Sequence, residues 1–205
     1  MDGATPRQGR KYDQVLDGAR RVFIAQGYEG ASVDDIARAA GVSKATLYSY
    51  FTDKRQMFAE VYQAEIEHLA ASTMQELCAD SAPEHALQLA ARRLVGYMTS
   101  DFGRAMYRIC VTESARFPEI GQAFYESGPE LGRARLGAYL RAAVAQGELV
   151  IEDFDLAADQ FFQLCQTTLC DRMLCNVQTR FSEAEIARVV DGAVAMFMAR
   201  YGARR

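Results

Sequence analysis

The stretch from Ser43 to Tyr50 carries the side chains best suited to bind a charged polymer. It reads Ser-Lys-Ala-Thr-Leu-Tyr-Ser-Tyr, so it offers hydroxyl, ammonium and methyl groups and contains no acidic residue. Hydroxyl groups donate hydrogen bonds to phosphates or base edges, and a small methyl group contacts the methyl of thymine. This combination favours a helix that lies against nucleic acid. The alternative is a short tyrosine-rich helix that only packs on its neighbour.

Three helix starts surround this stretch and predict how it is positioned. Ser32 and Ser43 each suit an N-cap, and Gly41 between them suits the left-handed residue that ends a helix. Two short helices joined around a glycine make a helix-turn-helix unit. Asp53 caps a third helix, with Gln56 completing a capping box. The second helix would enter a major groove by its N-terminal end, which carries partial positive charge.

Apolar periodicity predicts an all-α chain with about nine helices and no convincing strand. A helix over residues 11–27 supplies the core that the two short helices lack, which gives a three-helix unit. A long helix follows from residue 53 to about 78. Further helices are expected over residues 83–98, 101–117, 120–126, 131–147, 156–176 and 182–201, with a brief extended piece at 149–151 as an alternative to plain loop. Residues 1–56 then form a DNA-binding domain and residues 57–205 a second helical domain.

Composition and charge narrow the function classes. A chain of 205 residues that is 50% hydrophobic can bury one or two compact cores. The net charge is −4, but residues 1–60 hold nine basic and eight acidic groups, so the acidic excess lies later. No apolar run approaches the ~20 residues that span a membrane, and no signal peptide is evident. Five cysteines without a disulfide pattern favour a reducing cytoplasm. A basic arm with Arg7, Arg10 and Lys11 either reaches DNA or is only solvated.

The residues of an enzyme or a metal centre are missing from the sequence. The two histidines, His68 and His85, have no partner at the spacing of a catalytic triad or a metal site. Cys165, Cys170 and Cys175 recur every five residues, which turns each one roughly 140° from the last on a helix. They therefore do not share a face, and buried structural thiols are favoured over a redox sensor. We expect no catalytic site, no metal and no cofactor.

The segment from Gly27 to Lys54 resembles the DNA-binding domain of the TetR/AcrR family of transcriptional regulators. The resemblance is carried by Ser-Val-Asp-Asp-Ile-Ala, Ala-Gly-Val-Ser-Lys, Thr-Leu-Tyr, Tyr-Phe and the following Lys. Farther on, residues 113–119 and 128–130 resemble the AefR-like type of C-terminal domain in that family. Matching positions imply phosphate contacts by Ser32, Ser43, Lys44, Tyr48, Tyr50 and Lys54, base contacts by Ala45 and Thr46, and Ser49 as a further candidate. Ala31 departs from the threonine that the family often has there, which puts one phosphate contact in doubt.

The resemblance implies a homodimeric repressor that binds a palindromic DNA operator and is released by a small-molecule effector. Predominance of Phe and Tyr suggests an apolar or aromatic effector. Candidate effector contacts are Tyr97, Met106, Cys110, Glu113, Phe117, Phe124, Tyr125, Tyr139, Phe161 and Cys165. The alternative is that most of these are ordinary core residues, and for Glu113 a buried carboxylate with an Arg or Tyr partner is favoured.

The last two predicted helices, 156–176 and 182–201, carry more apolar surface than a terminal hairpin needs. We interpret them as the dimer interface, where two such hairpins form a four-helix bundle; the alternative is burial within one subunit. A second function class also stays open, in which the same fold is a DNA-organising or protein-interaction module that regulates no promoter. A third is a helical enzyme or carrier with a vestigial motif.

Overall fold

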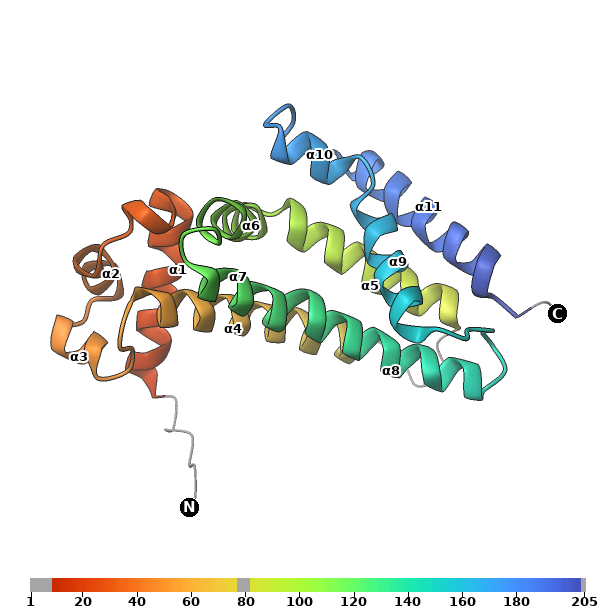
Figure 1. Ribbon diagram of the computed structural model, residues 1–205, viewed down its shortest axis with the longest axis horizontal. Helices are drawn as coiled ribbons and strands as arrows, with labels where there is room; N and C mark the ends of the chain where they lie inside the picture. The colour runs from red at the N-terminus through yellow and green to blue at the C-terminus, as the bar shows by residue number, and fades with distance from the viewer. Residues whose placement is uncertain (1–8, 77–81, 204–205) are drawn as a thin grey trace, which may run out of the picture. The chain divides into compact units, whose positions relative to one another are not determined.

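The computed structural model describes residues 9–76 and 82–203 and shows that they are almost entirely helical (Figure 1). The α-helices are α1 (Arg10–Gly30), α2 (Val33–Ala40), α3 (Lys44–Tyr48), α4 (Lys54–Glu76), α5 (Pro83–Thr99), α6 (Asp101–Glu113), α7 (Pro118–Tyr125), α8 (Leu131–Ala145), α9 (Phe154–Gln166), α10 (Leu169–Leu174) and α11 (Glu183–Tyr201). A π-helical segment, η1 (Glu126–Glu130), joins α7 to α8. Among these residues the β-structure is limited to an isolated bridge between Leu149 and Gly202. The prediction of an all-α chain is confirmed.

The predicted single helix over residues 156–176 is wrong, because the chain breaks between α9 and α10. Thr168 lies in the left-handed region with φ 61°, and the amide of Thr167 donates to the carbonyl of Leu164. A β-branched residue rarely adopts this conformation. No glycine or proline marks the break, so the sequence carries no ordinary signal for it. The predicted helix 101–117 also ends earlier, at Glu113, and residues 114–116 form a turn before Pro118 begins α7.

The chain divides into two compact units that do not follow a single cut in the sequence. Within the described residues, the N-terminal unit comprises residues 9–65 and Ala105–Phe124, and the C-terminal unit comprises the rest. Helices α4, α6 and α7 each contribute residues to both units. The predicted boundary between residues 56 and 57 therefore stays a functional proposal and is not the boundary between compact units.

The core of the N-terminal unit is built on aromatic rings and one close helix crossing. Phe23 lies against Tyr28 and Phe58, with ring centroids 6.0 and 5.7 Å away. Gly18 on α1 packs directly on α2, since a Cβ built at Gly18 would lie 2.7 Å from the backbone nitrogen of Ala40. A larger residue at this position would push α1 and α2 apart.

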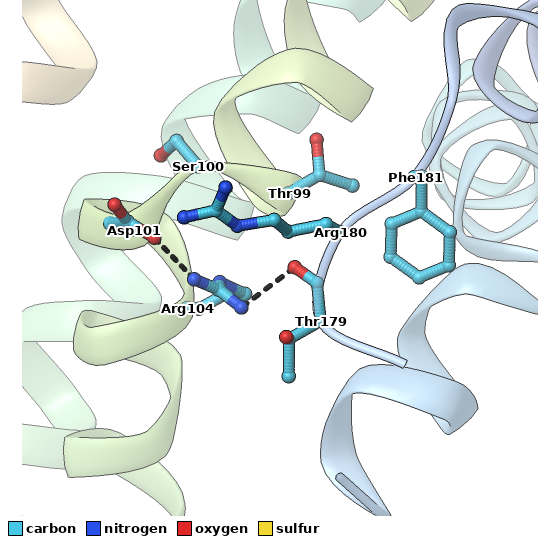
Figure 2. A pocket seen from close by; sticks show the side chains of 7 residues that line it. All are labelled: Thr99, Ser100, Asp101, Arg104, Thr179, Arg180 and Phe181. Atoms are coloured by element: carbon cyan, nitrogen blue, oxygen red, sulfur yellow. Dashed lines mark hydrogen bonds and ion pairs between the residues drawn. The ribbon is translucent and has the colours of Figure 1, made fainter. Parts of the chain in front are cut away.

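The core of the C-terminal unit is formed by α5, α8, α9 and α11. Phe161 contacts Phe197 edge to face, and Phe197 lies 4.8 Å from the ring of Tyr201. The Tyr201 hydroxyl donates to Gln160 over 2.6 Å. A pocket of about 330 Å³ opens in this unit where α5 meets α6 (Figure 2). In the described part of the chain, no helix is long and apolar enough to cross a membrane.

Candidate nucleic-acid interface

The two short helices of the N-terminal unit are capped as the sequence predicts. Ser32 Oγ accepts from the amide of Asp35 over 3.0 Å at the start of α2. Gly41 ends α2 in the left-handed region at φ 66°. Ser43 Oγ accepts from the amide of Thr46 over 3.1 Å at the start of α3. Each cap satisfies an amide that the helix itself leaves without a partner, so the turn between α2 and α3 has a defined geometry.

Helix α3 is anchored on one side and open on the other. Leu47 is fully buried, and Phe51 just beyond the helix is 1% exposed. The outward side carries short, polar and aromatic side chains. Lys44, Ala45, Tyr48 and Ser49 are exposed, and Thr46 and Tyr50 are half-buried. The helix itself ends at Tyr48, so Ser49 and Tyr50 lie in the turn that follows.

Several outward side chains already have weak partners within the unit. The ammonium of Lys44 forms an ion pair with Asp34, and both side chains are more than half exposed. The hydroxyls of Ser43 and Thr46 lie 2.9 Å apart, and Ser49 Oγ donates to the carbonyl of Thr46 over 2.6 Å. An exposed ion pair contributes about 0–1 kcal/mol, so Lys44 can exchange Asp34 for a phosphate at little cost.

Tyr50 is positioned by Tyr12, a residue that was not among the candidates predicted from the sequence. The two rings meet edge to face at 5.8 Å, and Tyr12 stacks on Phe51 at 5.2 Å. The Tyr12 hydroxyl donates to Glu60 on α4 over 2.9 Å. Tyr12 lies three residues before the buried Val15, on the same face of α1, and this spacing is the signal that could have revealed it.

Lys54 at the start of α4 has a structural role as well as a predicted phosphate contact. Its ammonium donates to the carbonyls of Tyr28 over 2.6 Å and Ala31 over 3.0 Å, and lies 4.3 Å from the centre of the Tyr28 ring. Desolvation lowers the pKa of Lys54, and burial raises the pKa of Tyr28 to about 12. Two of the three ammonium hydrogens are thus used to hold the junction between α1 and α2.

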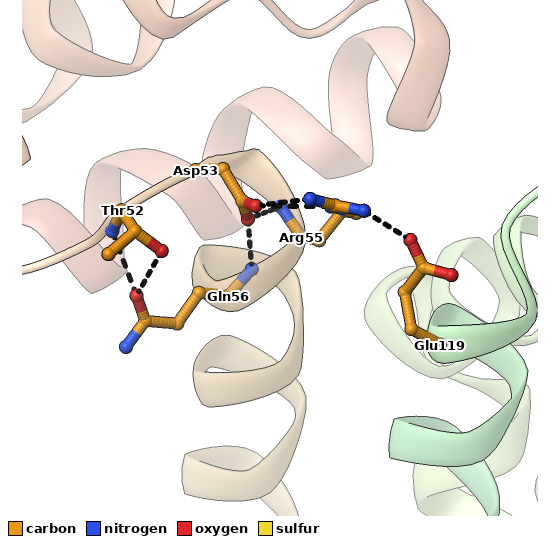
Figure 3. Close-up of polar contacts among 5 residues, drawn as sticks. All are labelled: Thr52, Asp53, Arg55, Gln56 and Glu119. Atoms are coloured by element: carbon orange, nitrogen blue, oxygen red, sulfur yellow. Dashed lines mark hydrogen bonds and ion pairs between the residues drawn. The ribbon is translucent and has the colours of Figure 1, made fainter.

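The first turn of α4 is fixed by a network of polar side chains (Figure 3). Asp53 Oδ1 accepts from the amide of Gln56 over 2.9 Å, and this hydrogen bond, with further ones from Arg55, lowers the pKa of Asp53. The predicted capping box is altered, because Gln56 Oε1 accepts from the amide of Thr52 over 2.8 Å and not from that of Asp53. Arg55 also reaches Glu119 on α7 over 2.5 Å.

A second ion pair joins the same parts of the N-terminal unit. Arg116 lies 2.9 Å from Glu29, near the end of α1, and Phe117 meets Tyr28 edge to face at 5.9 Å. Residues 116–119 are therefore attached, through two ion pairs and one ring contact, to α1 and α4, the helices that flank the helix-turn-helix. The partners in these pairs are far apart in the sequence and belong to no motif, so the sequence alone does not indicate them.

The ten candidate effector contacts are divided between the two units. Met106, Cys110, Glu113, Phe117 and Phe124 belong to the N-terminal unit, and Tyr97, Tyr125, Tyr139, Phe161 and Cys165 belong to the C-terminal unit. Met106, Phe161 and Cys165 are buried in their cores, and Phe124 stacks on Tyr62 at 4.6 Å. Tyr125 is exposed and accepts from Arg133. None of the ten lines the pocket in Figure 2, so their role in effector binding stays a prediction.

Three of the described cysteines, Cys110, Cys165 and Cys170, lie in surroundings that disfavour the reactive thiolate. Burial raises the pKa of Cys165 to about 12 and that of Cys170 to about 11. Cys175 is exposed, and Cys78 and the arm residue Arg7 lie outside the described residues. In the ranges 9–76 and 82–203, no group of three or more His, Cys, Asp or Glu side chains is placed to hold a metal ion.

Comparison with known proteins identifies the family to which this chain is similar. The model of the tetR family of bacterial regulatory proteins matches residues 15–61, and that of the AefR-like transcriptional repressor C-terminal domain matches residues 85–203. The transcriptional activator FasR of Mycolicibacterium smegmatis is 32% identical over 96 residues, which is 47% of this chain and 43% of FasR. The matched stretch is thus less than half the length of FasR.

Solved structures extend the similarity to nearly the whole chain. A TetR-family transcriptional regulator from Mesorhizobium loti superposes with a TM-score of 0.84 at 31% identity, covering 97% of this chain and 100% of that one. The flavonoid-responsive regulator FrrA superposes with a TM-score of 0.73 at 34% identity, covering 96% and 100%. The chain therefore belongs to the TetR family of bacterial regulatory proteins, and it is a DNA-binding transcriptional regulator, not an enzyme, with an AefR-like C-terminal domain.

Proposed function

We propose that this protein is a ligand-responsive repressor that binds a palindromic operator as a homodimer and is released by a small-molecule effector. The observation that carries the DNA-binding part is the outward side of α3. It is exposed, free of acidic residues and held at a defined angle by the cap at Ser43 and the buried Leu47. A second subunit related by a two-fold axis would present the same helix to the other half-site.

The roles of single residues follow from their place on this surface. Ala45 and Thr46 in the first turn of α3 would meet base edges, with Ser49 as a further candidate. The remaining side chains would bind phosphates and fix the register on the duplex. They are Ser32, Ser43, Lys44, Tyr48, Tyr50 and Lys54. The partial positive charge at the N-terminus of α3 would add to the attraction of the DNA backbone.

Repression is supported by the AefR-like repressor domain that matches residues 85–203. A dimer bound at a promoter would block RNA polymerase sterically. FasR, which is similar over 47% of the chain, is named an activator. A promoter assay therefore has to measure the direction of control as well as its size.

Release by an effector requires that DNA and ligand favour different conformations. The two binding free energies are then coupled reciprocally. If the ligand lowers the affinity for DNA, DNA lowers the affinity for the ligand by the same factor. An aromatic effector is supported by FrrA, a relative described as flavonoid-responsive. Helix α4 contributes residues to both compact units, and we propose that its shift changes the spacing of the two recognition helices.

Selection of bound sequences from random duplex DNA tests this proposal. The purified protein should enrich one palindrome. Ala45→Asp places a carboxylate on the exposed side of α3 and should abolish enrichment, because it repels phosphates without disturbing the core. Ala25→Asp introduces the same charge at an exposed alanine of α1 and should leave enrichment intact.

The outcomes separate the proposal from its alternatives. A folded dimer that enriches no sequence would contradict operator recognition. Enrichment of many unrelated sequences would instead support a DNA-organising module. Equal loss with Ala45→Asp and Ala25→Asp would mean that α3 is not the recognition helix.

A further inference from the structure

The pocket of the C-terminal unit is lined by three segments that carry no residue of the proposed DNA surface. It lies where the end of α5 meets the start of α6, opposite the segment that leads into α11 (Figure 2). Its volume is about 330 Å³. The lining residues are Thr99, Ser100, Asp101, Arg104, Thr179, Arg180 and Phe181. This volume lies at the small end of the range for ligand pockets.

One guanidinium in this pocket is held rigidly. Arg104 donates to the carbonyl of Thr179 over 2.7 Å and forms an ion pair with Asp101. Its side chain is 21% exposed, and its buried Nε–H has no hydrogen-bond partner within the described residues. Arg104 thus fixes the 179–181 segment against α6 and keeps a positive charge at the base of the pocket.

A second guanidinium is available to a ligand. Arg180 is exposed, and Figure 2 shows its side chain extending toward the corner between α5 and α6. Its guanidinium makes no hydrogen bond or ion pair with the part of the chain that the structure describes. Asp101 neutralises one of the two positive charges that line the pocket, so the lining has an excess of one positive charge. The two positively charged guanidinium groups repel each other, and a bound anion would offset this repulsion.

The remaining lining groups favour an anion with an apolar body. The hydroxyls of Thr99 and Ser100 donate to carbonyls of α5 and are not free as donors. Phe181 is half-buried and belongs to the lining of the pocket, where it is the aromatic residue. The donors left for a ligand are thus the Arg180 guanidinium and the Thr179 hydroxyl, and Phe181 supplies the aromatic part of the lining.

We propose that this pocket binds a small organic carboxylate with an aromatic body. A guanidinium offers two parallel N–H groups that match the two oxygens of a carboxylate, and the ring of the ligand would pack on Phe181. The volume suits a single-ring compound. Binding at this site is measured without DNA, so its failure would leave the proposed operator recognition untouched.

Calorimetric titration of the full-length protein tests the site, with sodium benzoate as the probe. Benzoate should bind at one site per chain with a Kd on the order of 1 mM or below. Benzamide has the same ring without the charge and should bind at least about tenfold more weakly. Sodium sulfate supplies charge without a ring and should also bind at least about tenfold more weakly.

A pair of arginine variants locates the binding in the pocket. Arg180→Gln removes the proposed carboxylate contact and should weaken benzoate binding at least about tenfold. Arg188→Gln removes the same charge from an exposed arginine of α11 that does not line the pocket, and should leave benzoate binding unchanged. Thermal unfolding of both variants should match that of the parent protein, which shows that each is folded.

Three results would overturn the proposal. Equal affinity for benzoate and benzamide would mean that no carboxylate is recognised. Equal affinity for benzoate and sulfate would mark a site for inorganic anions. Equal weakening by Arg180→Gln and Arg188→Gln, or no saturable benzoate binding to the folded parent, would show that the pocket is not the site.

Discussion

At the residue scale, Thr46 and Tyr48 should have separable effects on DNA binding. Thr46→Ala removes a side chain proposed to meet base edges, so it should cost about 1–3 kcal/mol on the selected operator and little on random duplex. Tyr48→Phe removes a proposed phosphate contact and should weaken both kinds of binding alike. Fluorescence titration of both duplexes with each variant measures the difference. Equal losses for Thr46→Ala on operator and random DNA would exclude it as a base contact.

Lys54 combines a structural and a proposed DNA-binding role, and both can be measured. Lys54→Met keeps the length of the side chain but leaves the carbonyls of Tyr28 and Ala31 without its ammonium. The free energy of unfolding should fall by about 1–3 kcal/mol, the usual contribution of hydrogen bonds from a charged donor. The slope of log affinity against log salt should also fall by about one phosphate contact.

Lys44→Met is the matched control for Lys54. It removes an exposed ammonium whose partner is the exposed Asp34, so it should lower the salt slope and leave stability unchanged. A normal salt slope in Lys54→Met, together with reduced stability, would leave Lys54 a purely positioning residue.

At the element scale, helices with strong caps were predictable and the break between α9 and α10 was not. Ser32 and Ser43 are typical N-cap residues and Gly41 is a typical C-cap residue, and the structure confirms all three caps. Thr167 and Thr168 lie inside a run with helical periodicity and carry no stop signal. Packing of the C-terminal unit overrides local preference there, and packing is not visible in one sequence.

The break itself gives a prediction about stability. Thr168 has φ 61°, where a β-branched side chain is strained, so Thr168→Gly should raise the free energy of unfolding by about 0.5 kcal/mol. Thr167 has φ −46°, so Thr167→Gly relieves no backbone strain. It should lower the free energy of unfolding by about 0.5–1 kcal/mol. Urea unfolding of both variants measures the two changes in the free energy of unfolding. Equal destabilisation by the two glycines would mean that the left-handed residue stores no strain.

The start of α4 predicts a pH dependence. Folding lowers the pKa of Asp53 below its usual value of 3.8, chiefly through the amide of Gln56 and then through Arg55. The ionised form therefore stabilises the folded state above pH ~4, and this contribution disappears as the pH falls through the lower folded pKa. Asp53→Asn keeps a good N-cap and should cost about 0.3–1 kcal/mol at neutral pH.

The difference in unfolding free energy between the parent and Asp53→Asn should shrink below pH ~4. Asp13→Asn removes an exposed carboxylate for which the described residues show no hydrogen bond or ion pair, and should leave the profile nearly unchanged. A difference that stays constant down to pH ~3 would show that the charge of Asp53 does not stabilise α4.

At the scale of the whole molecule, the apolar stripe of the last helix could be buried in its own subunit or against a second subunit, and one sequence cannot distinguish the two. Val190, Val194, Phe197 and Tyr201 were expected to face a second subunit, but they are buried in the core of their own C-terminal unit. Periodicity shows that a face is covered and does not show which chain covers it. The dimer prediction therefore depends on the apolar side chains that stay exposed.

Those side chains lie on all three helices of the C-terminal segment. Leu156 on α9, Leu174 on α10 and Met196 on α11 are 51%, 50% and 63% exposed. We propose that a two-fold axis brings these surfaces together, so that one substitution alters the interface twice. Met196→Glu should then yield a folded monomer in sedimentation velocity, because each carboxylate would be desolvated without a partner.

Val150→Glu is the control for this substitution, because Val150 is also 63% exposed but precedes α9. It should remain a dimer. The Met196→Glu monomer should also lose operator affinity, since each half-site would then be bound without the effective concentration that linkage supplies. A dimeric Met196→Glu would move the interface away from α11. If only the Val150→Glu variant dissociates, the dimer interface lies at the connection between α8 and α9.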